Sequence, residues 1–316
     1  MITAIETYPP FGRALRMENR HVKLFVTLDV GPRIIHFGRP DGENLFFVDS
    51  EGVTDQPLSG LTEKFGTDAV YRFYGGHRLW VWPEEYGWTY CPDNAPVTTE
   101  ERDSITWFTP PPQAENGLQL SLGVRLNDET GQVTIFHKVQ NIGREQTTLA
   151  LWGITQMANG GVEIIPQSKR DTGLKLDRTI ALWPYTDMGD SRITWGDDAI
   201  LLRGDRAAER PIKFGLRNRH GWAAYCLENL TFLKRFAPGP EDQNPFALYP
   251  DEGCSFETYT NSKFVEIESL GPVVEARPGE SATLIETWSL HDGTPEFEQG
   301  NPSSALAFAQ KIIKAD

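Results

Sequence analysis

The residues with the most obvious chemistry stand between Tyr74 and Trp88, where an imidazole, a guanidinium, two carboxylates and five aromatic rings occur within fifteen residues. The imidazole belongs to His77 and the guanidinium to Arg78, directly after Gly75-Gly76. Glycine adopts backbone conformations closed to other residues, so this pair can turn the chain and place both side chains at the start of a strand. Because arginine is rarely buried without a partner, the pattern favours a functional role for His77 and Arg78.

Two tryptophans follow in the same predicted strand. Trp80 and Trp82 share one face of that strand because they are two residues apart. Flat apolar rings beside ionisable groups suit a sugar, whose C–H faces stack on the rings and whose hydroxyls form hydrogen bonds. The alternative is a core strand in which the rings only pack against other side chains. The sequence leaves both interpretations open.

A second group of candidate residues lies late in the chain. Phe264, Glu266 and Glu268 share one face of a predicted strand, and Val265 and Ile267 lie on the other. Two carboxylates this close repel each other, so both stay ionised only if the face is wet or a cation lies nearby, and otherwise one carboxyl has a raised pKa. A site for proton transfer and an exposed sheet face both fit this pattern.

Two further strands place titratable groups among apolar residues. His137 falls on the face of Ile135 and Val139, which predicts a buried, hydrogen-bonded histidine rather than a catalytic one. Lys234 and Arg235 lie within an aromatic strand, where one of them points inward or both lie on the solvated face of an edge strand. An inward Lys234 is a candidate to bind the substrate.

The elements that must position these residues are mostly strands. Segments such as Val22–Asp29, Leu118–Leu126 and Val133–Val139 alternate between apolar and polar residues and are separated by turn sequences. We expect roughly fifteen to eighteen strands, far more than an average domain holds. The predicted fold is all-β, a large antiparallel β-sandwich formed as a single domain by residues 1–316, with a short C-terminal helix at about 303–314.

The composition excludes several classes of protein. A formal net charge of -14 and the absence of any Lys/Arg run argue against a nucleic-acid partner. No segment approaches the ~18 uninterrupted apolar residues of a membrane span, and the amino terminus lacks a signal-peptide pattern, so we expect no membrane partner and a cytoplasmic protein. The three widely spaced cysteines predict reduced, packed thiols.

The sequence contains no motif for binding a cofactor or a metal. It carries no phosphate-binding loop, dinucleotide fingerprint, GxSxG elbow or HExxH sequence, so no cofactor is expected. His77 with Glu84 or Glu85 matches no familiar set of metal ligands, and no metal is expected either.

Several short motifs carry a resemblance to a known superfamily. The run Val26–Ile35, followed by Asp41–Leu45, resembles the opening of galactose mutarotase-like proteins, and Gln140–Gly143 resembles their "v-x-N-x-G" turn. The resemblance extends from about Val22 to Leu290. It implies the mutarotase-like supersandwich. The stretches "GGHRLW-x-x-PE" and "F-x-E-I-E-S-L-G-P" look like an uncharacterised branch of this superfamily.

The resemblance also implies candidate site residues. Ala276–Glu280 looks like the turn before the last strand, and the catalytic glutamate of the hexose-phosphate mutarotases stands about a dozen residues earlier, which lands on Glu266. Glu266 is therefore the favoured general base, with Glu268 as the second choice. Glu257 occupies the longer, galactose-type spacing and remains a third candidate at the substrate.

The rest of the implied site comes from early strands. Arg78 resembles the substrate-binding arginine of the superfamily. The catalytic histidine of the superfamily would fall near Ile154 or Thr155. This chain has no histidine there, so His77 becomes the candidate acid. Gln156 and Trp152 are the nearest polar and aromatic residues to that position, and both are candidates to line a pocket without acting as acids.

The resemblance implies an aldose 1-epimerase-like isomerase that opens and closes a sugar ring by general acid-base catalysis without a cofactor. Its partner would be a small sugar or an oligosaccharide, phosphorylated or not. A carbohydrate-binding module without catalysis, and a lyase or glycosidase on the same fold, remain open alternatives. No pattern indicates the oligomeric state.

Overall fold

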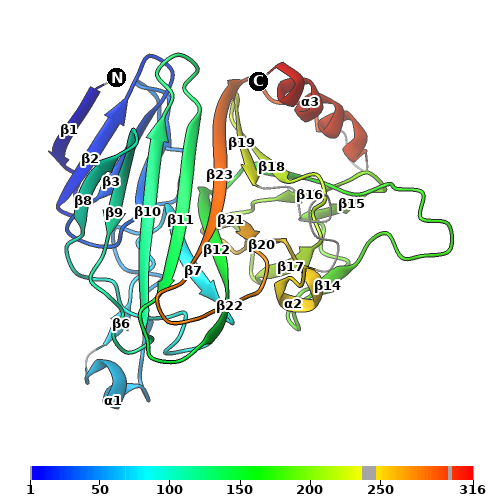
Figure 1. The fold of residues 1–316 in the computed structure, drawn as a ribbon. Helices are drawn as coiled ribbons and strands as arrows, with labels where there is room; N and C mark the ends of the chain where they lie inside the picture. Colours follow the sequence, from blue (N-terminus) through cyan, green and yellow to red (C-terminus); the bar gives the residue numbers. More distant parts are fainter. Residues whose placement is uncertain (1, 68, 237–246, 298–300, 316) are drawn as a thin grey trace.

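The structure is a computed structural model that describes residues 2–67, 69–236, 247–297 and 301–315. Within these residues two large antiparallel sheets, one of eleven strands and one of ten, face each other, and a two-stranded sheet lies apart from them. In Figure 1 the strands β8–β11 of the ten-stranded sheet overlap β2 and β3 of the eleven-stranded sheet. The predicted all-β sandwich is confirmed.

The eleven-stranded sheet carries most of the candidate site residues. Its strands pair in the order β1, β2, β3, β4, β7, β12, β21, β20, β17, β14, and β22 pairs separately with β12. Their bounds are Ile2–Thr7 (β1), Arg13–Glu18 (β2), Lys23–Thr27 (β3), Ile34–Gly38 (β4), His77–Trp82 (β7), Thr147–Ala158 (β12), Phe264–Leu270 (β21), Phe256–Thr260 (β20), Ile212–Leu216 (β17), Ile180–Leu182 (β14) and Val274–Ala276 (β22).

The ten-stranded sheet covers one face of the first. Its order is β15, β16, β13, β18, β19, β23, β11, β10, β9, β8. Its strands are Ile193–Trp195 (β15), Ala199–Arg203 (β16), Val162–Pro166 (β13), Trp222–Leu227 (β18), Leu230–Phe236 (β19), Ser281–Asp292 (β23), Val133–Asn141 (β11), Leu118–Leu126 (β10), Ile105–Thr109 (β9) and Thr98–Arg102 (β8). The small sheet pairs Gln56–Pro57 (β5) with Val70–Tyr71 (β6).

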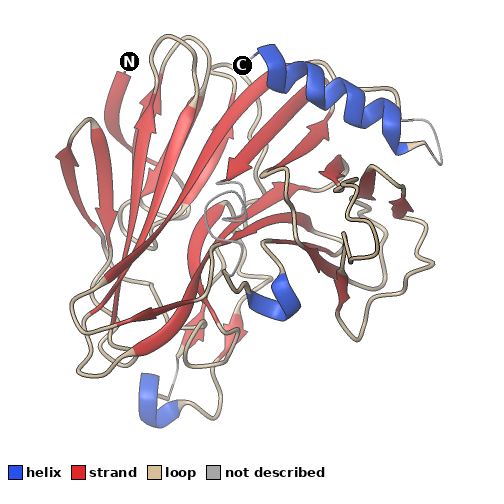
Figure 2. Cartoon of the chain, turned by 45° about the vertical axis from the view of Figure 1, so that its right-hand side comes forward, coloured by secondary structure: helices blue, strands red, loops and turns tan. Residues whose placement is uncertain are grey.

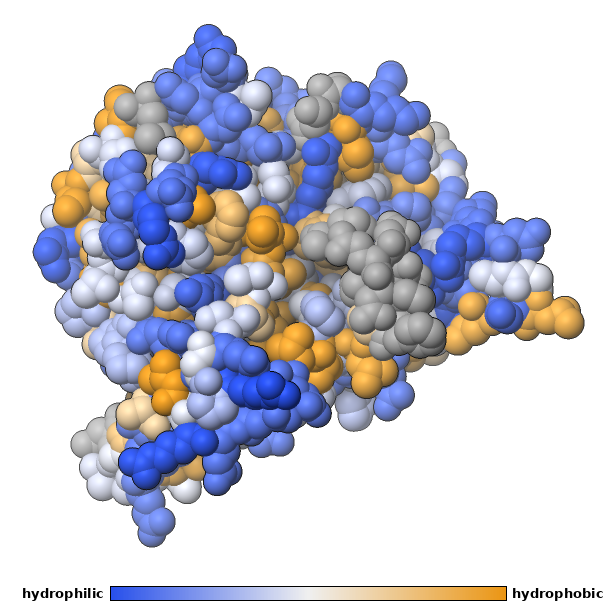
Figure 3. Space-filling model, in the orientation of Figure 1, coloured by the Kyte–Doolittle hydropathy of each residue, from blue (hydrophilic) through white to orange (hydrophobic). Residues whose placement is uncertain are grey.

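Apolar side chains fill the space between the two large sheets. Phe37 of β4 packs its ring 5.5 Å from Phe232 of β19 and 5.7 Å from Trp288 of β23. Leu24 and Val26 of β3 point into the same core, as their alternation predicts. Hydrophilic side chains dominate the face of the molecule seen in Figure 3, with smaller apolar patches between them.

Helices are few among the described residues. They are Thr62–Phe65 (α1), Pro250–Gly253 (α2) and Pro302–Ala315 (α3). The predicted C-terminal helix is confirmed as α3, which docks Ala305, Leu306 and Ala309 on the outer side of β13 and β16 (Figures 1 and 2). In the described parts of the chain, every helix is too short or too polar to cross a membrane.

The structure has more strands than the sequence predicts. The additional strands include β5, β6, β14, β15 and β22, which are two or three residues long. Such short segments carry no readable alternation, because a period of two needs several repeats to be recognised.

Candidate functional site

A cavity of about 380 Å³ opens on the face of the eleven-stranded sheet that is turned away from the ten-stranded sheet. Strands β7, β12, β21 and β17 contribute its inner end, and loops near residues 53–56, 84–90 and 185 contribute its rim. We call it the site pocket. Its volume suits a small organic ligand.

Strand alternation decides which side chains of β7 reach the site pocket. Gly75 and Gly76 have φ values of +94° and +66°, as expected for the glycine turn before this strand. After the turn, Arg78 and Trp80 line the pocket. His77 lies on the opposite face of β7, because neighbouring residues of a strand point in opposite directions.

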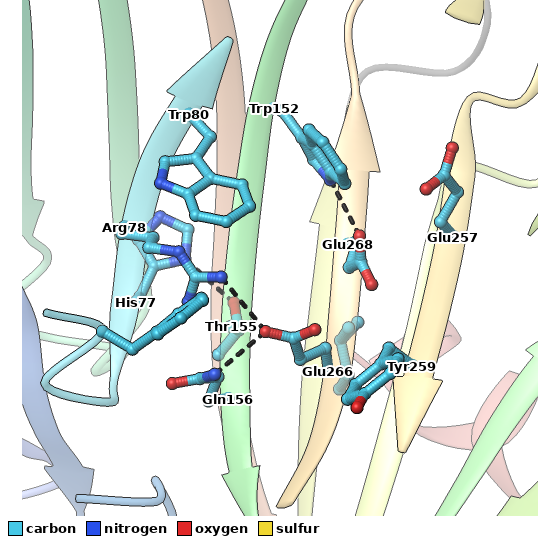
Figure 4. Close-up of polar contacts among 12 residues, drawn as sticks. His77, Arg78, Trp80, Trp152, Thr155, Gln156, Glu257, Tyr259, Glu266 and Glu268 are labelled. Carbon is cyan, nitrogen blue, oxygen red and sulfur yellow. Dashed lines mark hydrogen bonds and ion pairs between the residues drawn. The ribbon is translucent and has the colours of Figure 1, made fainter. Parts of the chain in front are cut away.

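Glu266 is held at the floor of the site pocket by two donors. Arg78 Nη2 donates to Glu266 Oε1 at 3.2 Å, and Gln156 Nε2 donates to the same oxygen at 3.0 Å (Figure 4). Because both bonds go to Oε1, neither occupies Oε2. The ion pair with Arg78 and the hydrogen bond from Gln156 fix the position of this carboxylate, which makes Glu266 the candidate general base of the site.

Arg78 is itself tightly enclosed. Its guanidinium carbon lies 4.9 Å from the centre of the Phe73 ring and 4.3 Å from that of Trp80. The side chain is only 1% exposed, yet Nε and Nη1 have no hydrogen-bond partner among the described residues. A buried donor without a partner costs free energy, so Nε and Nη1 are candidates to donate hydrogen bonds to a ligand.

Glu268 lies two residues further along β21 in a different environment. Its carboxyl is buried, and Oε2 accepts a hydrogen bond of 2.9 Å from Trp152 Nε1. Its Oε1 has no hydrogen-bond partner among the described side chains. Burial raises the pKa of Glu268 to about 7, although nearby Lys213 opposes the rise. Glu266 and Glu268 thus share a strand face but differ in what holds them.

Lys213 of β17 is a site residue that the sequence analysis missed. Its Nζ lies 3.0 Å from Glu257 Oε2, 3.7 Å from Glu268 Oε2 and 3.7 Å from Glu84 Oε2. Burial alone would lower the pKa of Lys213, but these carboxylates raise it well above its ordinary value. Since Lys213 alternates with two apolar residues, the sequence pattern is that of an ordinary half-buried strand with a solvated lysine.

The remaining predicted pocket residues divide into three groups. Trp80 and Trp152 line the site pocket, with ring centres 5.6 Å apart. Gln156 and Glu257 are fully buried beside it and contact Glu266 and Lys213 rather than the cavity. Trp82 shares the face of Trp80 but lies beyond the cavity, where its Nε1 donates to Asp251 of α2 at 3.2 Å.

His77 and Lys234 do not join the site pocket, contrary to the sequence-based expectation. Both are fully buried between the two sheets. His77 Nε2 lies 2.8 Å from His137 Nε2, and Lys234 Nζ lies 3.0 Å from Glu286 Oε1. We call these four residues the core polar cluster. His77 therefore cannot reach a ligand in the pocket and is corrected from candidate acid to core residue.

The position of Lys234 corrects a second expectation. β19 is a central strand of the ten-stranded sheet, so Lys234 lies neither on a solvated edge nor at the substrate. Its ammonium donates to the backbone oxygens of Gly153 and Ile267, at 2.9 and 3.0 Å. Lys234 therefore connects two strands of the opposite sheet.

The core polar cluster also bears on metal binding. Ligand atoms of His77, His137 and Glu286 lie within 4.8 Å of one another. Glu286 already pairs with the ammonium of Lys234, and the two imidazoles already contact each other. The cluster is thus a charge-compensated polar network, as the prediction of a buried His137 anticipates. Glu84 lies at the pocket and His77 in the core, so these two do not form a ligand pair.

Comparison with known proteins gives a match at the level of the fold. No protein-family model matches the sequence, and no curated protein matches it. A galactose mutarotase-like protein from Lactobacillus casei ATCC 334 superimposes with a TM-score of 0.55, covering 88% of this chain and 100% of that chain at 10% identity. The chain has the galactose mutarotase-like fold.

Other solved structures agree with this fold. A protein of Escherichia coli K12, whose name assigns it provisionally to aldose 1-epimerase, matches with a TM-score of 0.51 at 12% identity, covering 92% of this chain and 99% of that one. A protein of Synechocystis sp. PCC 6803 matches with a TM-score of 0.51 at 11% identity over 88% and 96%. At 10–12% identity these matches show a shared fold, and a shared fold does not fix the chemistry of the site pocket.

Proposed function

We propose that this protein is a mutarotase-like sugar isomerase that interconverts the anomers of an aldose in the site pocket. The observation that carries the proposal is the pair Glu266 and Glu268, two carboxyl groups on one strand face, of which one is held by Arg78 and Gln156 and the other is buried beside Trp152 with a raised pKa. Carboxyl pairs of this kind divide the roles of base and acid.

The site pocket has the polar groups that a polyol needs. Arg78 Nε and Nη1 are buried donors without partners, and Glu268 Oε1 is a buried carboxyl oxygen without a partner among the described residues. A sugar hydroxyl both donates and accepts, so one ring can satisfy groups of both kinds. Trp80 and Trp152 provide apolar ring surface beside them, on which C–H groups stack.

The proposed reaction uses the two carboxyls in opposite senses. Glu266 removes the proton from O1 as the C1–O1 bond becomes a carbonyl and the C1–O5 bond breaks. The electron pair left on O5 takes the proton of Glu268. After rotation about C1–C2, Glu268 recovers its proton, Glu266 returns the other, and the ring closes with the opposite configuration.

This assignment accounts for the absence of the superfamily histidine from the expected segment. The sequence has no histidine near Thr155, and His77 is fully buried. A carboxyl whose pKa lies near 7 is half protonated at neutral pH, as an unperturbed imidazole is. Glu268 can therefore replace the imidazole as the acid.

The cytoplasm is the proposed compartment. All three cysteines, Cys91, Cys226 and Cys254, are buried free thiols. Reduced thiols are typical of proteins kept in reducing compartments.

The test is the rate of α-to-β exchange, measured by magnetisation-transfer NMR for glucose, galactose, xylose and glucose 6-phosphate with and without the protein. We expect acceleration for at least one aldose, together with chemical-shift changes at the site pocket. Binding without acceleration would contradict the isomerase and leave a carbohydrate-binding protein. New reducing ends or unsaturated products from oligosaccharides would contradict it in favour of a glycosidase or lyase.

A further inference from the structure

Glu257 lies behind the site pocket and has no part in the reaction above. It stands directly opposite Glu268 in the register of the antiparallel strands β20 and β21, so the two side chains share one sheet face. Directly opposed like charges destabilise a strand pair unless something compensates them. The compensating group is Lys213 of the next strand, β17, whose ammonium contacts both carboxyls.

The charges around Lys213 do not balance. Its ammonium contacts three carboxyls, those of Glu84, Glu257 and Glu268. The Glu84 side chain is 37% exposed and is therefore solvated, whereas Glu257 and Glu268 are fully buried. The other cation at the pocket floor, Arg78, is paired with Glu266. One ammonium thus serves two buried carboxyls, and burying a second negative charge without compensation is costly.

The distances indicate which of the two carboxyls ionises first. Lys213 Nζ lies 3.0 Å from Glu257 Oε2 and 3.7 Å from Glu268 Oε2. The rings of Trp152 and Trp183, each 4.6 Å from Nζ, enclose the ammonium on two sides. The shorter contact stabilises the anion of Glu257 more, which leaves the proton with Glu268.

Resting on the isomerase function proposed above, we propose that Glu257 and Glu268 share one proton across Lys213. Glu257 is the positioning residue of this unit: its negative charge engages Lys213 and so keeps the proton on Glu268, facing the sugar. Because Glu257 lies outside the cavity lining, it acts on the reaction only through Lys213 and Glu268.

Other titratable groups surround the pair Glu257 and Glu268. Burial raises the pKa of Glu257 and that of Glu268; Lys213 opposes the rise in both, and Arg78 opposes it in Glu268. Further negative charge comes from Glu84 and Glu266 at the pocket and from Asp251 of α2. From the core side, Glu268 also interacts with the carboxyl of Glu163, whose pKa burial raises well above its ordinary value, and with the ammonium of Lys234, which pairs with Glu286. The remaining titratable neighbours, Tyr185, Tyr259 and Cys254, are neutral at neutral pH.

The first test is the pH profile of anomer exchange for the wild type and Glu257→Gln. The neutral amide frees Lys213 to pair with Glu268, which would then lose its proton at lower pH. We expect the falling limb of the rate to move down by about one pH unit or more while sugar affinity stays unchanged. Glu100→Gln, on the exposed strand β8, is the matched control and should leave the profile unchanged. An unmoved limb in Glu257→Gln would overturn the proposal.

A second test does not depend on activity. In protein labelled with carbon-13 at the glutamate carboxyls, we expect one buried carboxyl of the wild type to titrate near neutral pH, and that titration to move to lower pH in Glu257→Gln. If that variant does not fold, Glu268→Gln replaces it, and the near-neutral titration should disappear because Glu257 alone then pairs with Lys213. Persistence of that titration would overturn the shared proton even if the protein proves to be an isomerase. A shift of that titration to lower pH in Glu257→Gln would support the shared proton even if no sugar is turned over.

Discussion

At the scale of single residues, the site depends on identical side chains that differ in surroundings. Glu266 receives two hydrogen bonds on one oxygen, from a guanidinium and an amide. Glu268 receives one from an indole and is buried more completely. The sequence predicts that both share a strand face with a possible pKa difference, but it cannot say which of the two is the acid, because the partners come from β7, β12 and β17.

Arg78 supplies the first prediction at this scale. Arg78→Lys keeps a positive charge beside Glu266 but removes the planar donors Nε and Nη1, which have no hydrogen-bond partner among the described residues. We expect sugar affinity to fall about ten- to hundred-fold, the loss of one or two hydrogen bonds to a charged group. Calorimetric titration measures it. Arg102→Lys, on exposed β8 with its guanidinium over the Trp107 ring, is the control and should bind normally.

The raised pKa of Glu268 leads to a second prediction, which concerns how the free energy of unfolding changes with pH. The ordinary carboxyl pKa is 4.5 and that of Glu268 is about 7, so the folded protein holds this proton more strongly than the unfolded chain. The stabilisation is fully present below about pH 4.5 and is lost as the pH rises through 7. Relative to the wild type, Glu268→Gln should gain about 3 kcal/mol in free energy of unfolding between pH 4.5 and 8. Urea titrations measure this, and a constant difference would contradict the raised pKa.

At the scale of elements, three strands separate the residues that face the site pocket from those that face the core. β7, β12 and β21 send one set of alternate residues to the site pocket and the other to the core. The alternation of Val265 and Ile267 against Glu266 and Glu268 was predictable and is confirmed. For His77 and Arg78 the sequence could not decide which faces the ligand, since both faces of β7 are buried and polar residues occupy both. Lys213 was missed because its partners come from other strands.

The glycine turn before β7 gives the prediction at this scale. A Cβ on Gly76 would stand against the backbone oxygen of Ile34, and the residue has a φ of +66°. Gly76→Ala should therefore lower the free energy of unfolding by about 1–3 kcal/mol and displace Arg78. Gly271→Ala is the control, because its Cβ would meet only ordinary contacts at 3.6 Å or more. Equal stabilities of the two variants in urea would contradict this account of the turn.

At the scale of the whole molecule, the core polar cluster joins the two sheets. Lys234 and Glu286 come from the ten-stranded sheet, and Lys234 reaches across to the backbone of Gly153 and Ile267 in the other. Trp288 Nε1 and Ser269 Oγ also donate to Glu286. The cluster therefore holds the sheets in register beneath the site pocket without contributing to its lining.

Removing the ammonium tests this role. Lys234→Met leaves the Glu286 carboxylate buried without its cation, and we expect a loss of about 3–5 kcal/mol in free energy of unfolding. The double variant Lys234→Met/Glu286→Gln should recover part of the loss, because no uncompensated charge remains. Wherever the single variant still folds, its sugar affinity should equal that of the wild type. A large loss of affinity without a loss of stability would place Lys234 in the site after all.

The sequence predicted the overall architecture better than it predicted the site. Long alternating strands such as β10 and β11 and the C-terminal helix α3 carry their own signals, and the mutarotase-like motifs of the early strands gave the fold. The pairing of β4 with β7, β7 with β12 and β12 with β21 joins segments far apart in the chain. No local pattern specifies such pairings, and they create the site pocket.

The measurement that tests the central claim most directly is the anomer-exchange rate of the wild type and Glu266→Gln, made with the aldose that the wild type binds best. The amide retains the size of the side chain and removes the base. We predict that the wild type accelerates exchange, that Glu266→Gln loses about 10²- to 10⁴-fold of the rate while still binding the sugar, and that Glu100→Gln loses none. A Glu266→Gln protein as fast as the wild type would contradict the account.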